Sequence, residues 1–476
     1  MQSDYLAYDA IGLAELVKKR EVSARELIDT AISRAEAVNP AINALVLKDY
    51  AAARERAAPD GALGNGPLAG VPYLIKDLGA PVAGLRMSMG SRHYRHYIPG
   101  EDAPVVTLAR AAGLNIFGKT STSEIGQMPY TEPELFGPCR NPWSLDHTPG
   151  GSSGGAAAAV AAGIVPIAHA SDGGGSIRIP ASACGLFGLK PTRARTPVGP
   201  DLGETWNGAG IAHAVTRTVR DSAALLDATC GAEVGDPYPA PLRERPYLDE
   251  VSAEPGALRI AVTAKAWNGQ PVDPECASAV AAAAKLCAEL GHRADEARPE
   301  WDEKARAAAS RVIIGAHVRA QLDEREEQLG RAATADDLER RAWSTAEYGR
   351  AKTAADYALA IRATHRVGRA LGRFFEEWDV LLTPTMCRPP HRLGVLSLMN
   401  PDGNAFSEAL LGTVAFTSPF NGSGHPAMSV PLHTSKDGLP VGVQFVGRYG
   451  AETTLFRLAG QLERARPWAD RRPPLD

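Results

Sequence analysis

Two serines in glycine-rich segments are the residues of this sequence best suited to nucleophilic chemistry. Ser152 lies in the run GGSSGG at 150–155, and Ser176 ends the run DGGGS at 172–176. Glycine has no Cβ, so its backbone can adopt strained dihedrals and approach a substrate carbonyl closely. Each run alone equally fits a linker or a tight turn. An apolar helix and a buried strand are expected between them, so together they favour two exposed hydroxyls at the ends of one helix–strand unit.

The second glycine run also has the composition of an oxyanion hole. Successive backbone N–H groups in the turn from Asp172 to Ser176 can point into one concavity. Such preorganised donors stabilise the negative charge that develops on a carbonyl oxygen during acyl transfer. The two runs therefore indicate acyl-transfer chemistry.

A serine hydroxyl becomes a strong nucleophile only when a base accepts its proton. His147 and His169 are close in the sequence, but neither has a recognisable carboxylate to orient it. Lys76 follows the apolar strand VPYLI at 71–75, which should carry it into the interior. Burial disfavours the ammonium and lowers the pKa of a lysine, as a lysine base at neutral pH requires. On this segment alone, a lysine paired with Asp77 is the more ordinary interpretation.

Three other patterns offer different chemistry. The segment GLNIFGKT at 113–120 matches the phosphate-binding pattern GxxxxGK[ST] of nucleotide hydrolases. A phosphate loop should follow a strand and open a helix, whereas here a helix comes first and LNIF has the makeup of a strand. Glu132 and Glu134 could pair as acid and base, but the proline between them favours a loop-tying role. His93 and His96 lack the third ligand of a catalytic zinc, so we expect no metal and no organic cofactor.

The elements that would position these residues alternate between helix and strand. The apolar pattern predicts strands at 164–168, 258–262, 380–382, 424–432 and 441–446, and a C-terminal helix at 452–465. From about 301 to 377 the pattern is almost wholly helical, which we interpret as a helical layer or insertion on a single domain spanning 1–476. We therefore expect an α/β fold in which a large mixed twisted sheet is flanked by helices on both faces.

The composition is that of an ordinary globular enzyme. The 476 residues are 44% hydrophobic and 22% charged, with a formal net charge of −4. No basic excess points to nucleic acid, and the longest apolar run, near 156–170, is broken by Gly163 and Pro166, so we expect no transmembrane segment. The first ten residues are polar and acidic, unlike a signal peptide, and the six cysteines have no regular spacing. We expect free thiols in a cytoplasmic protein.

Several segments of the chain resemble the amidase signature family of serine hydrolases. They are GVPYLIKDL, GKTSTSEIG, RNPWSLDHTPGGSSGG and SDGGGSIRIPASACGLFGLKPT, followed by GHPAMSVPL and LPVGVQFVG nearer the C-terminus. The resemblance spans nearly the whole chain, with a core signature at about 66–220. Within the family, the TEPE and CRNPW loops and GVQFVGRYG make the chain most similar to the 6-aminohexanoate cyclic dimer hydrolase type.

The resemblance implies a role for each residue of the site. It makes Ser176 the nucleophile that forms an acyl-enzyme, Ser152 the bridging serine that follows a cis peptide bond, and Lys76 the base. Neutral Lys76 would take the proton of Ser152 while Ser152 takes that of Ser176, and the proton would return to the leaving amine. The oxyanion hole would consist of the backbone amides of Gly173, Gly174, Gly175 and Ser176.

The resemblance also implies a substrate class. Relatives of this type act on small or xenobiotic amides, and other members cleave anilides and carbamates, so an aryl acylamidase and a urethanase stay open. An amidotransferase subunit fits less well. We expect a small-molecule amide or carbamate as the partner, no nucleic acid and no membrane, and we keep a homodimer open. The apolar side chains of Tyr73, Met87 and Met89 near the base favour short aryl or alkyl amides over peptides.

Overall fold

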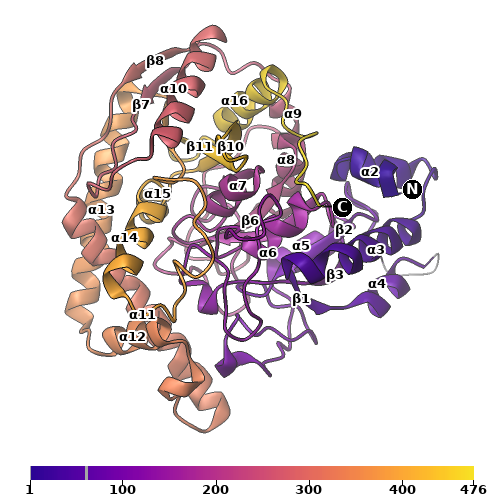
Figure 1. The fold of residues 1–476 in the computed structure, drawn as a ribbon, viewed down its shortest axis with the longest axis horizontal. Helices are drawn as coiled ribbons and strands as arrows, with labels where there is room; N and C mark the ends of the chain where they lie inside the picture. The colour runs from indigo at the N-terminus through magenta and orange to yellow at the C-terminus, as the bar shows by residue number, and fades with distance from the viewer. Residues whose placement is uncertain (1, 59–62, 476) are drawn as a thin grey trace.

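An eleven-stranded sheet runs through the computed structural model, which describes residues 2–58 and 63–475 (Figure 1). The strand order is β1-β3-β2-β4-β6-β5-β10-β11-β9-β7-β8. Parallel pairs, such as β2 with β3, occur beside antiparallel pairs, such as β4 with β6. The strands are β1 (Leu45–Lys48), β2 (Pro72–Lys76), β3 (Asn115–Thr120), β4 (Ile167–Asp172), β5 (Phe187–Lys190), β6 (Ile211–Thr216), β7 (Arg259–Val262), β8 (Arg293–Glu296), β9 (Val380–Pro384), β10 (Ala427–Thr434) and β11 (Pro440–Gly447).

Helices flank this mixed sheet, and the predicted α/β class is confirmed. The α-helices are α1 (Gln2–Ala7), α2 (Ala10–Lys18), α3 (Ala24–Ile42), α4 (Tyr50–Arg56), α5 (Pro104–Ala111), α6 (Gly154–Ala161), α7 (Arg178–Cys184), α8 (Val219–Thr229), α9 (Tyr247–Val251), α10 (Pro274–Glu289), α11 (Glu303–Leu329), α12 (Arg340–Arg350), α13 (Ala354–Glu377), α14 (Gly403–Val414), α15 (Ser418–Ser423) and α16 (Glu452–Ala465). Short 3₁₀ turns occur at η1 (Arg92–Tyr94), η2 (Glu124–Gly126) and η3 (Ala335–Asp337).

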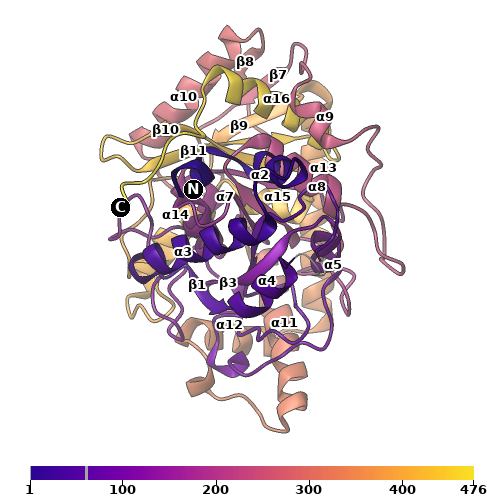
Figure 2. The same ribbon diagram turned by 90° about the vertical axis from the view of Figure 1, so that its right-hand side faces the viewer.

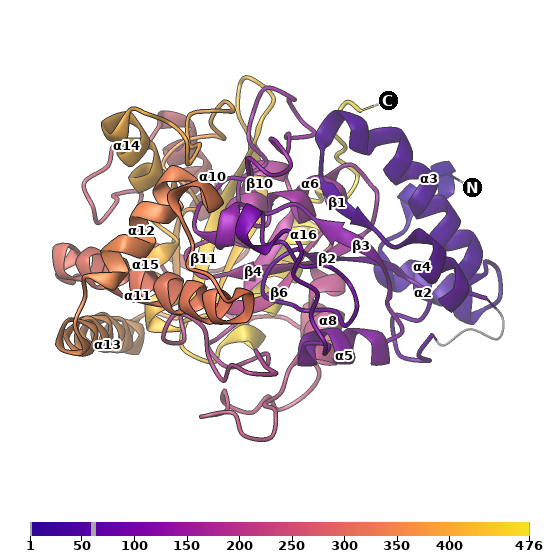
Figure 3. The same ribbon diagram turned by 90° about the horizontal axis from the view of Figure 1, so that it is seen from below.

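The predicted helical region near 301–377 forms α11, α12 and α13. These helices lie at the end of the molecule opposite α2, α3 and α4 (Figures 1 and 3). Helix α13 begins at a capping box in which Thr353 and Asp356 exchange hydrogen bonds. Its buried face carries apolar residues at helical spacing, including Ala363, Val367 and Leu371. Within the described residues, no helix is both long and apolar enough to span a membrane.

Helix α6 lies in the core and begins at Gly154, within the first glycine run. All eight of its residues are buried, as expected for a helix without a polar face. A Cβ at Gly155 would lie 2.5 Å from the backbone nitrogen of Ser121, so only glycine allows this close approach. The packing of α6 therefore fixes the segment that carries Ser152 against the sheet.

Several predicted boundaries are wrong. The strand expected at 424–432 is β10, which begins at Ala427 and ends at Thr434, and two other errors lie beside the second glycine run. The strand expected at 164–168 is β4, which begins at Ile167 and ends at Asp172. The helical segment ends at Gly163, whose φ is +73°. The pairing of β4 with β6 starts at Ile167, the residue after Pro166, and continues to Asp172. Asp172 is thus the last residue of a strand rather than part of the glycine turn. Strand β6, which pairs with β4 along its whole length, was not predicted.

The phosphate-loop alternative is also wrong. Most of that segment is the buried strand β3, which pairs with β1 on one side and β2 on the other. Its backbone groups are used in strand pairing and are not free to cradle a phosphate. Lys119, at the end of the motif, is buried with its Nζ 3.8 Å from the carboxylate of Asp77.

The two ends of the described chain meet beside the N-terminal helices (Figure 2). Arg472, in the C-terminal segment, donates a hydrogen bond of 2.7 Å to the carbonyl of Leu6 in α1. Trp468 is buried in the same segment and donates from Nε1 to the carbonyl of Arg217. These contacts anchor the C-terminal segment to helix α1 and to the end of β6.

Candidate active site

Lys76 and two serines form a buried hydrogen-bonded group at the ends of neighbouring strands. Lys76 is the last residue of β2, and its Nζ lies 2.7 Å from Ser152 Oγ and 3.0 Å from Ser171 Oγ. Ser171 is the penultimate residue of β4, the strand beside β2. The peptide bond between Gly151 and Ser152 is cis. The structure thus brings Lys76 and Ser152 together as predicted and adds Ser171, which the sequence analysis did not assign to the site.

The environment of Lys76 suits a neutral amine. The side chain is fully buried, and burial lowers the pKa of Lys76 to about 7, although the negative charge of Asp172 acts in the opposite direction. Asp77, the alternative partner, accepts hydrogen bonds from Ser88 and lies near Lys119. The ordinary interpretation of the segment, a lysine paired with its neighbour, is therefore wrong.

Ser176 follows β4 in the second glycine turn. It is half-buried, and its hydroxyl has no hydrogen-bond partner within the residues that the structure describes. Helix α7 begins two residues later at Arg178. The hydroxyl is thus available to a ligand, which is what a nucleophile requires.

The turn itself is held by the buried carboxylate of Asp172. Asp172 Oδ1 accepts a hydrogen bond of 2.7 Å from the Gly175 N–H, and Oδ2 accepts one of 3.1 Å from the Ile177 N–H. The Arg178 guanidinium binds both carboxylate oxygens at 2.9 Å. Burial alone would raise the pKa of Asp172. The positive charge of Arg178 and several hydrogen bonds instead hold this pKa well below its usual range.

One predicted member of the oxyanion hole is used internally. Because the Gly175 N–H donates to Asp172, it is not free to bind a substrate oxygen. Within the described residues, the N–H groups of Gly173, Gly174 and Ser176 have no protein acceptor. Free amides in a fixed turn are the feature that an oxyanion hole requires, so three of the four predicted donors stay available.

Residues far along the chain complete the support of this turn. Asn421, in α15, donates to the Asp172 carboxylate at 2.8 Å, and Thr417 donates to the Gly174 carbonyl at 2.7 Å. Gln444, in β11, accepts a hydrogen bond of 2.7 Å from Arg178. The sequence analysis missed these three residues. Their separation from the turn, 249 residues for Asn421 and Asp172, leaves no local pattern that would reveal them.

The first glycine run owes its composition to a close approach of two backbone segments. A Cβ at Gly151 would lie 2.2 Å from the carbonyl oxygen of Tyr130. A Cβ at Gly126 would lie 3.5 Å from Ser152 Oγ, so this second segment also lines the serine. Only glycine fits at position 151, because any side chain there would overlap the backbone of Tyr130. The segment that carries Gly126 packs against the hydroxyl of Ser152.

The alternative bases lie outside this group. Burial lowers the pKa of His169 to about 3, so its imidazole is neutral, and its ring nitrogens have no hydrogen-bond partner among the described residues. His147 Nδ1 lies 2.8 Å from Ser144 Oγ. Neither imidazole forms a hydrogen bond with Ser152 or Ser176 within the described part of the chain.

The two carboxylates of the TEPE loop have separate structural partners. Glu132 accepts a hydrogen bond of 2.8 Å from the Gly394 N–H, and burial raises the pKa of Glu132 to about 7. Glu134 forms an ion pair of 2.6 Å with Arg92. Both side chains tie loops together, as predicted. Residues 2–58 and 63–475 contain no cluster of three potential metal ligands.

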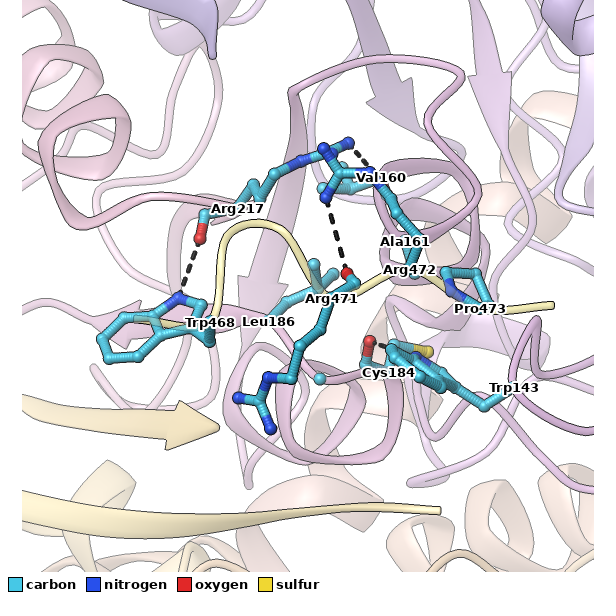
Figure 4. A pocket seen from close by; sticks show the side chains of 11 residues that line it. Trp143, Val160, Ala161, Cys184, Leu186, Arg217, Trp468, Arg471, Arg472 and Pro473 are labelled. Carbon is cyan, nitrogen blue, oxygen red and sulfur yellow. Dashed lines mark hydrogen bonds between the residues drawn. The ribbon is translucent and has the colours of Figure 1, made fainter. Parts of the chain in front are cut away.

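A small cavity lies under the C-terminal segment (Figure 4). Trp143, Cys184, Trp468 and Arg472 are among its lining residues, and Trp143 donates from Nε1 to the Cys184 carbonyl at 2.8 Å. Its volume of about 10 Å³ holds at most one water molecule. None of the candidate catalytic residues lines it, so this cavity is a packing gap rather than a substrate site.

Comparisons with known proteins identify the family of the chain. A family model described as Amidase matches residues 26–456. The 6-aminohexanoate-cyclic-dimer hydrolase of Paenarthrobacter ureafaciens is 41% identical over 479 aligned residues, which cover 98% of this chain and 96% of that protein. A solved structure of 6-aminohexanoate cyclic dimer hydrolase complexed with substrate has a TM-score of 0.93 at 40% identity and covers 99% of both chains.

A bacterial aryl acylamidase of the amidase signature family has a TM-score of 0.88 at 28% identity, with 97% of both chains covered. The resemblance inferred from the sequence motifs is thereby confirmed. The chain belongs to the amidase family, and it is an enzyme that hydrolyses amide bonds.

Proposed function

We propose that the protein hydrolyses small amides through an acyl-enzyme formed on Ser176, with Ser152 as the proton bridge and Lys76 as the base. The observation that carries this proposal is the 2.7 Å contact between the buried Lys76 amine and Ser152 Oγ. A pKa of about 7 for Lys76 leaves a large neutral fraction at physiological pH. The amine can then accept a proton without a histidine.

In the acylation step, Ser176 Oγ attacks the carbonyl carbon of the substrate. Its proton passes to Ser152 Oγ while the proton of Ser152 passes to Lys76 Nζ. Collapse of the tetrahedral intermediate breaks the C–N bond, and the proton returns through Ser152 to the leaving amine. Water then attacks the ester of Ser176, with the same groups accepting and returning its proton.

The free amides of the glycine turn fit the charge that develops in this step. The N–H groups of Gly173, Gly174 and Ser176 would donate to the oxyanion, and the Asp172 hydrogen bonds would keep the turn rigid. Donors that are already oriented avoid a reorganisation cost in the transition state. Loss of a single such donor typically costs about 10²–10³ in kcat.

The proposed substrates are small amides, including anilides and other xenobiotic amides, with carbamates as a second group. Similarity to a cyclic-dimer amide hydrolase and to an aryl acylamidase supports this class. The apolar side chains of Tyr73, Met87 and Met89 are buried in hydrophobic core clusters and do not bear on the substrate class. A panel of nitroanilides, a carbamate and a peptide amide tests the class, and preferential cleavage of the peptide amide would contradict it.

Labelling with a serine-directed fluorophosphonate tests the nucleophile. We expect the adduct on Ser176, because this hydroxyl is half-buried and free while Ser152 is fully enclosed. Ser176→Ala should abolish turnover and labelling without changing the circular dichroism spectrum. An adduct on Ser152 or Ser171 would overturn the assignment.

A further inference from the structure

A tryptophan lies directly against the glycine turn. A Cβ at Gly173 would lie 2.8 Å from both Cε3 and Cζ3 of Trp206, so the absence of a side chain at Gly173 makes room for the indole ring. Trp206 is only partly buried and keeps surface for a ligand. An aromatic side chain thus flanks the turn whose N–H groups would hold the substrate carbonyl.

The backbone that presents Trp206 is unusual. Trp206, Asn207 and Gly208 have φ values of 51°, 54° and 71°, in a hairpin closed by a bridge between Thr205 and Gly210. A positive φ is a genuine outlier for a residue as bulky as tryptophan, and such outliers cluster at functional sites. The conformation persists because neighbouring groups hold it.

One side chain connects this hairpin with the glycine turn. Asn421 donates from Nδ2 to the Ala209 carbonyl at 3.1 Å and to the Asp172 carboxylate at 2.8 Å. Arg193 donates to the Gly208 carbonyl at 2.9 Å. Hydrogen bonds to the two residues Gly208 and Ala209 therefore hold the hairpin that carries Trp206 against the turn.

The helical layer supports the other side of the indole. Trp206 packs against a buried cluster formed by Ala309 and Ile313 of α11 and Ala360 and Ala363 of α13. These two helices lie together on one side of the sheet (Figure 3). The helical region near 301–377, for which no sequence motif could be assigned, therefore contacts the site through Trp206.

We propose that Trp206 is a specificity-determining residue and forms the apolar wall for the acyl group of the substrate. The inference rests on the proposed function. A carbonyl oxygen bound to the turn puts its acyl substituent beside Gly173, whereas the leaving amine must face Ser152, near Lys76 and Gly126. An indole face favours aryl and extended alkyl acyl groups, because both can stack on it.

Acyl-chain selectivity tests this assignment. The substrates are p-nitroanilides with acetyl, hexanoyl and benzoyl groups, and the variants are Trp206→Ala and Trp206→Phe. Trp206→Ala should lower kcat/KM about 10–100-fold for the hexanoyl and benzoyl substrates and less than about threefold for acetyl, with Phe retaining most selectivity. Equal losses for all three substrates would overturn the proposal.

A matched control separates this effect from general loss of packing. Trp378, partly buried and stacked on Phe374 at a ring distance of 6.3 Å, lies far from the glycine turn in the sequence. Trp378→Ala should leave the acyl preference unchanged. Circular dichroism and thermal unfolding verify that each variant is folded. If Trp206→Ala does not fold, the acyl preference of Trp206→Phe is compared with that of the wild type instead.

A double variant tests the contact itself. Gly173→Ala should lower kcat/KM at least tenfold, because the added methyl displaces the ring of Trp206. The double variant with Trp206→Ala should recover most of this loss on the acetyl substrate. A double variant no more active than Gly173→Ala would show that the ring does not lie against the turn.

Binding to an inactive enzyme distinguishes this inference from the proposed function. In a Ser176→Ala background, Trp206→Ala should weaken the calorimetric affinity for hexananilide about tenfold or more. Unchanged affinity would overturn the inference. A wild-type enzyme that cleaves no amide or carbamate of the panel would contradict the proposed function, while the Trp206 dependence of binding would still stand.

Discussion

At the residue scale, the proposed mechanism depends on the protonation state of Lys76. A lysine in water is almost entirely charged at neutral pH, and a charged amine cannot accept a proton. Full burial lowers the pKa of Lys76 to about 7, and the carboxylate of Asp172 opposes that shift. Desolvation therefore outweighs the charge of the neighbouring aspartate. In the proposed mechanism, this balance sets the pH at which half of the enzyme is active.

The first prediction concerns that balance. The rate should rise with pH along a limb near pH 7, because Lys76 accepts a proton only after losing its own. Lys76→Ala should lower kcat about 10²–10⁴-fold. Lys76→Arg should not restore it, because a guanidinium stays protonated. A pH–rate profile checks this, with His147→Ala as the active control, and a Lys76→Ala enzyme of near-normal rate would place the base elsewhere.

The second prediction concerns Ser171, whose hydroxyl is the second one that contacts Lys76. Its oxygen accepts an N–H from Lys76 at 3.0 Å and so orients the amine toward Ser152. Ser171→Ala should lower kcat about fivefold, the size of one hydrogen bond of ~1 kcal/mol. It should also move the acidic limb to lower pH, because an acceptor favours the ammonium over the amine. Ser171→Thr keeps the hydroxyl and should restore the limb, and an unmoved limb in Ser171→Ala would argue against contact with Lys76.

At the element scale, the glycine turn between β4 and α7 is held by a buried ion pair. Asp172 and Arg178 are both fully buried, with Oδ1 and Nη2 2.9 Å apart. Removing one member of such a pair leaves an uncompensated charge in the interior. The rigidity of the turn therefore depends on two charges that are buried in the protein interior.

The third prediction follows from this burial. Asp172→Asn should lower the free energy of unfolding by about 3–5 kcal/mol, because Arg178 loses its counter-charge. Asp379 is the matched control. Its partners Arg259 and Arg448 are 44% and 43% exposed, so Asp379→Asn should cost less than about 1 kcal/mol. Urea unfolding of both variants measures the difference, and equal costs would contradict a special role for the buried pair.

The parts of the site that sequence reasoning identified are those with a local pattern. The glycine runs, their serines and the lysine after an apolar strand all carry their chemistry within a few residues. Ser171 was passed over because a serine inside a strand has no distinctive spacing. Asn421 and Trp206 could not be predicted, since each contacts the glycine turn only after folding brings distant segments of the chain together. The same limit explains why β6 was missed while helix α16 was predicted with its exact bounds.

At the scale of the whole molecule, two buried glutamates connect the helical layer with the signature core. Glu124 accepts a hydrogen bond of 2.8 Å from the Glu339 N–H, and Glu339 accepts one of 2.9 Å from the Glu134 N–H. Burial raises the pKa of Glu124 to about 7 and that of Glu339 to about 8, and the charge of Glu124 contributes to the second shift. The two carboxyl groups thus favour their protonated forms in the folded protein.

The fourth prediction is the resulting pH dependence of stability. A raised pKa means that the folded state holds more protons than the unfolded state between about pH 4.5 and 8, so these groups lose their stabilising contribution as the pH rises through that window. Glu339→Gln should be more stable than the wild type by roughly 3–5 kcal/mol at pH 8.5 and nearly equal to it near pH 4.5. Glu300, 70% exposed, supplies the control variant Glu300→Gln. Denaturant unfolding across this range checks the difference, and a benefit independent of pH would contradict it.

The distance along the chain between Asp172 and Asn421 also affects when the enzyme can become active during its synthesis. Lys76, Ser152 and Ser176 all emerge from the ribosome in the first half of translation, but Asn421 follows Asp172 by 249 residues. At 5–20 residues per second, that interval lasts roughly 12–50 s. A nascent chain therefore carries all three proposed catalytic residues well before its glycine turn has its supporting side chains, and the proposed mechanism predicts hydrolysis only when translation is almost complete.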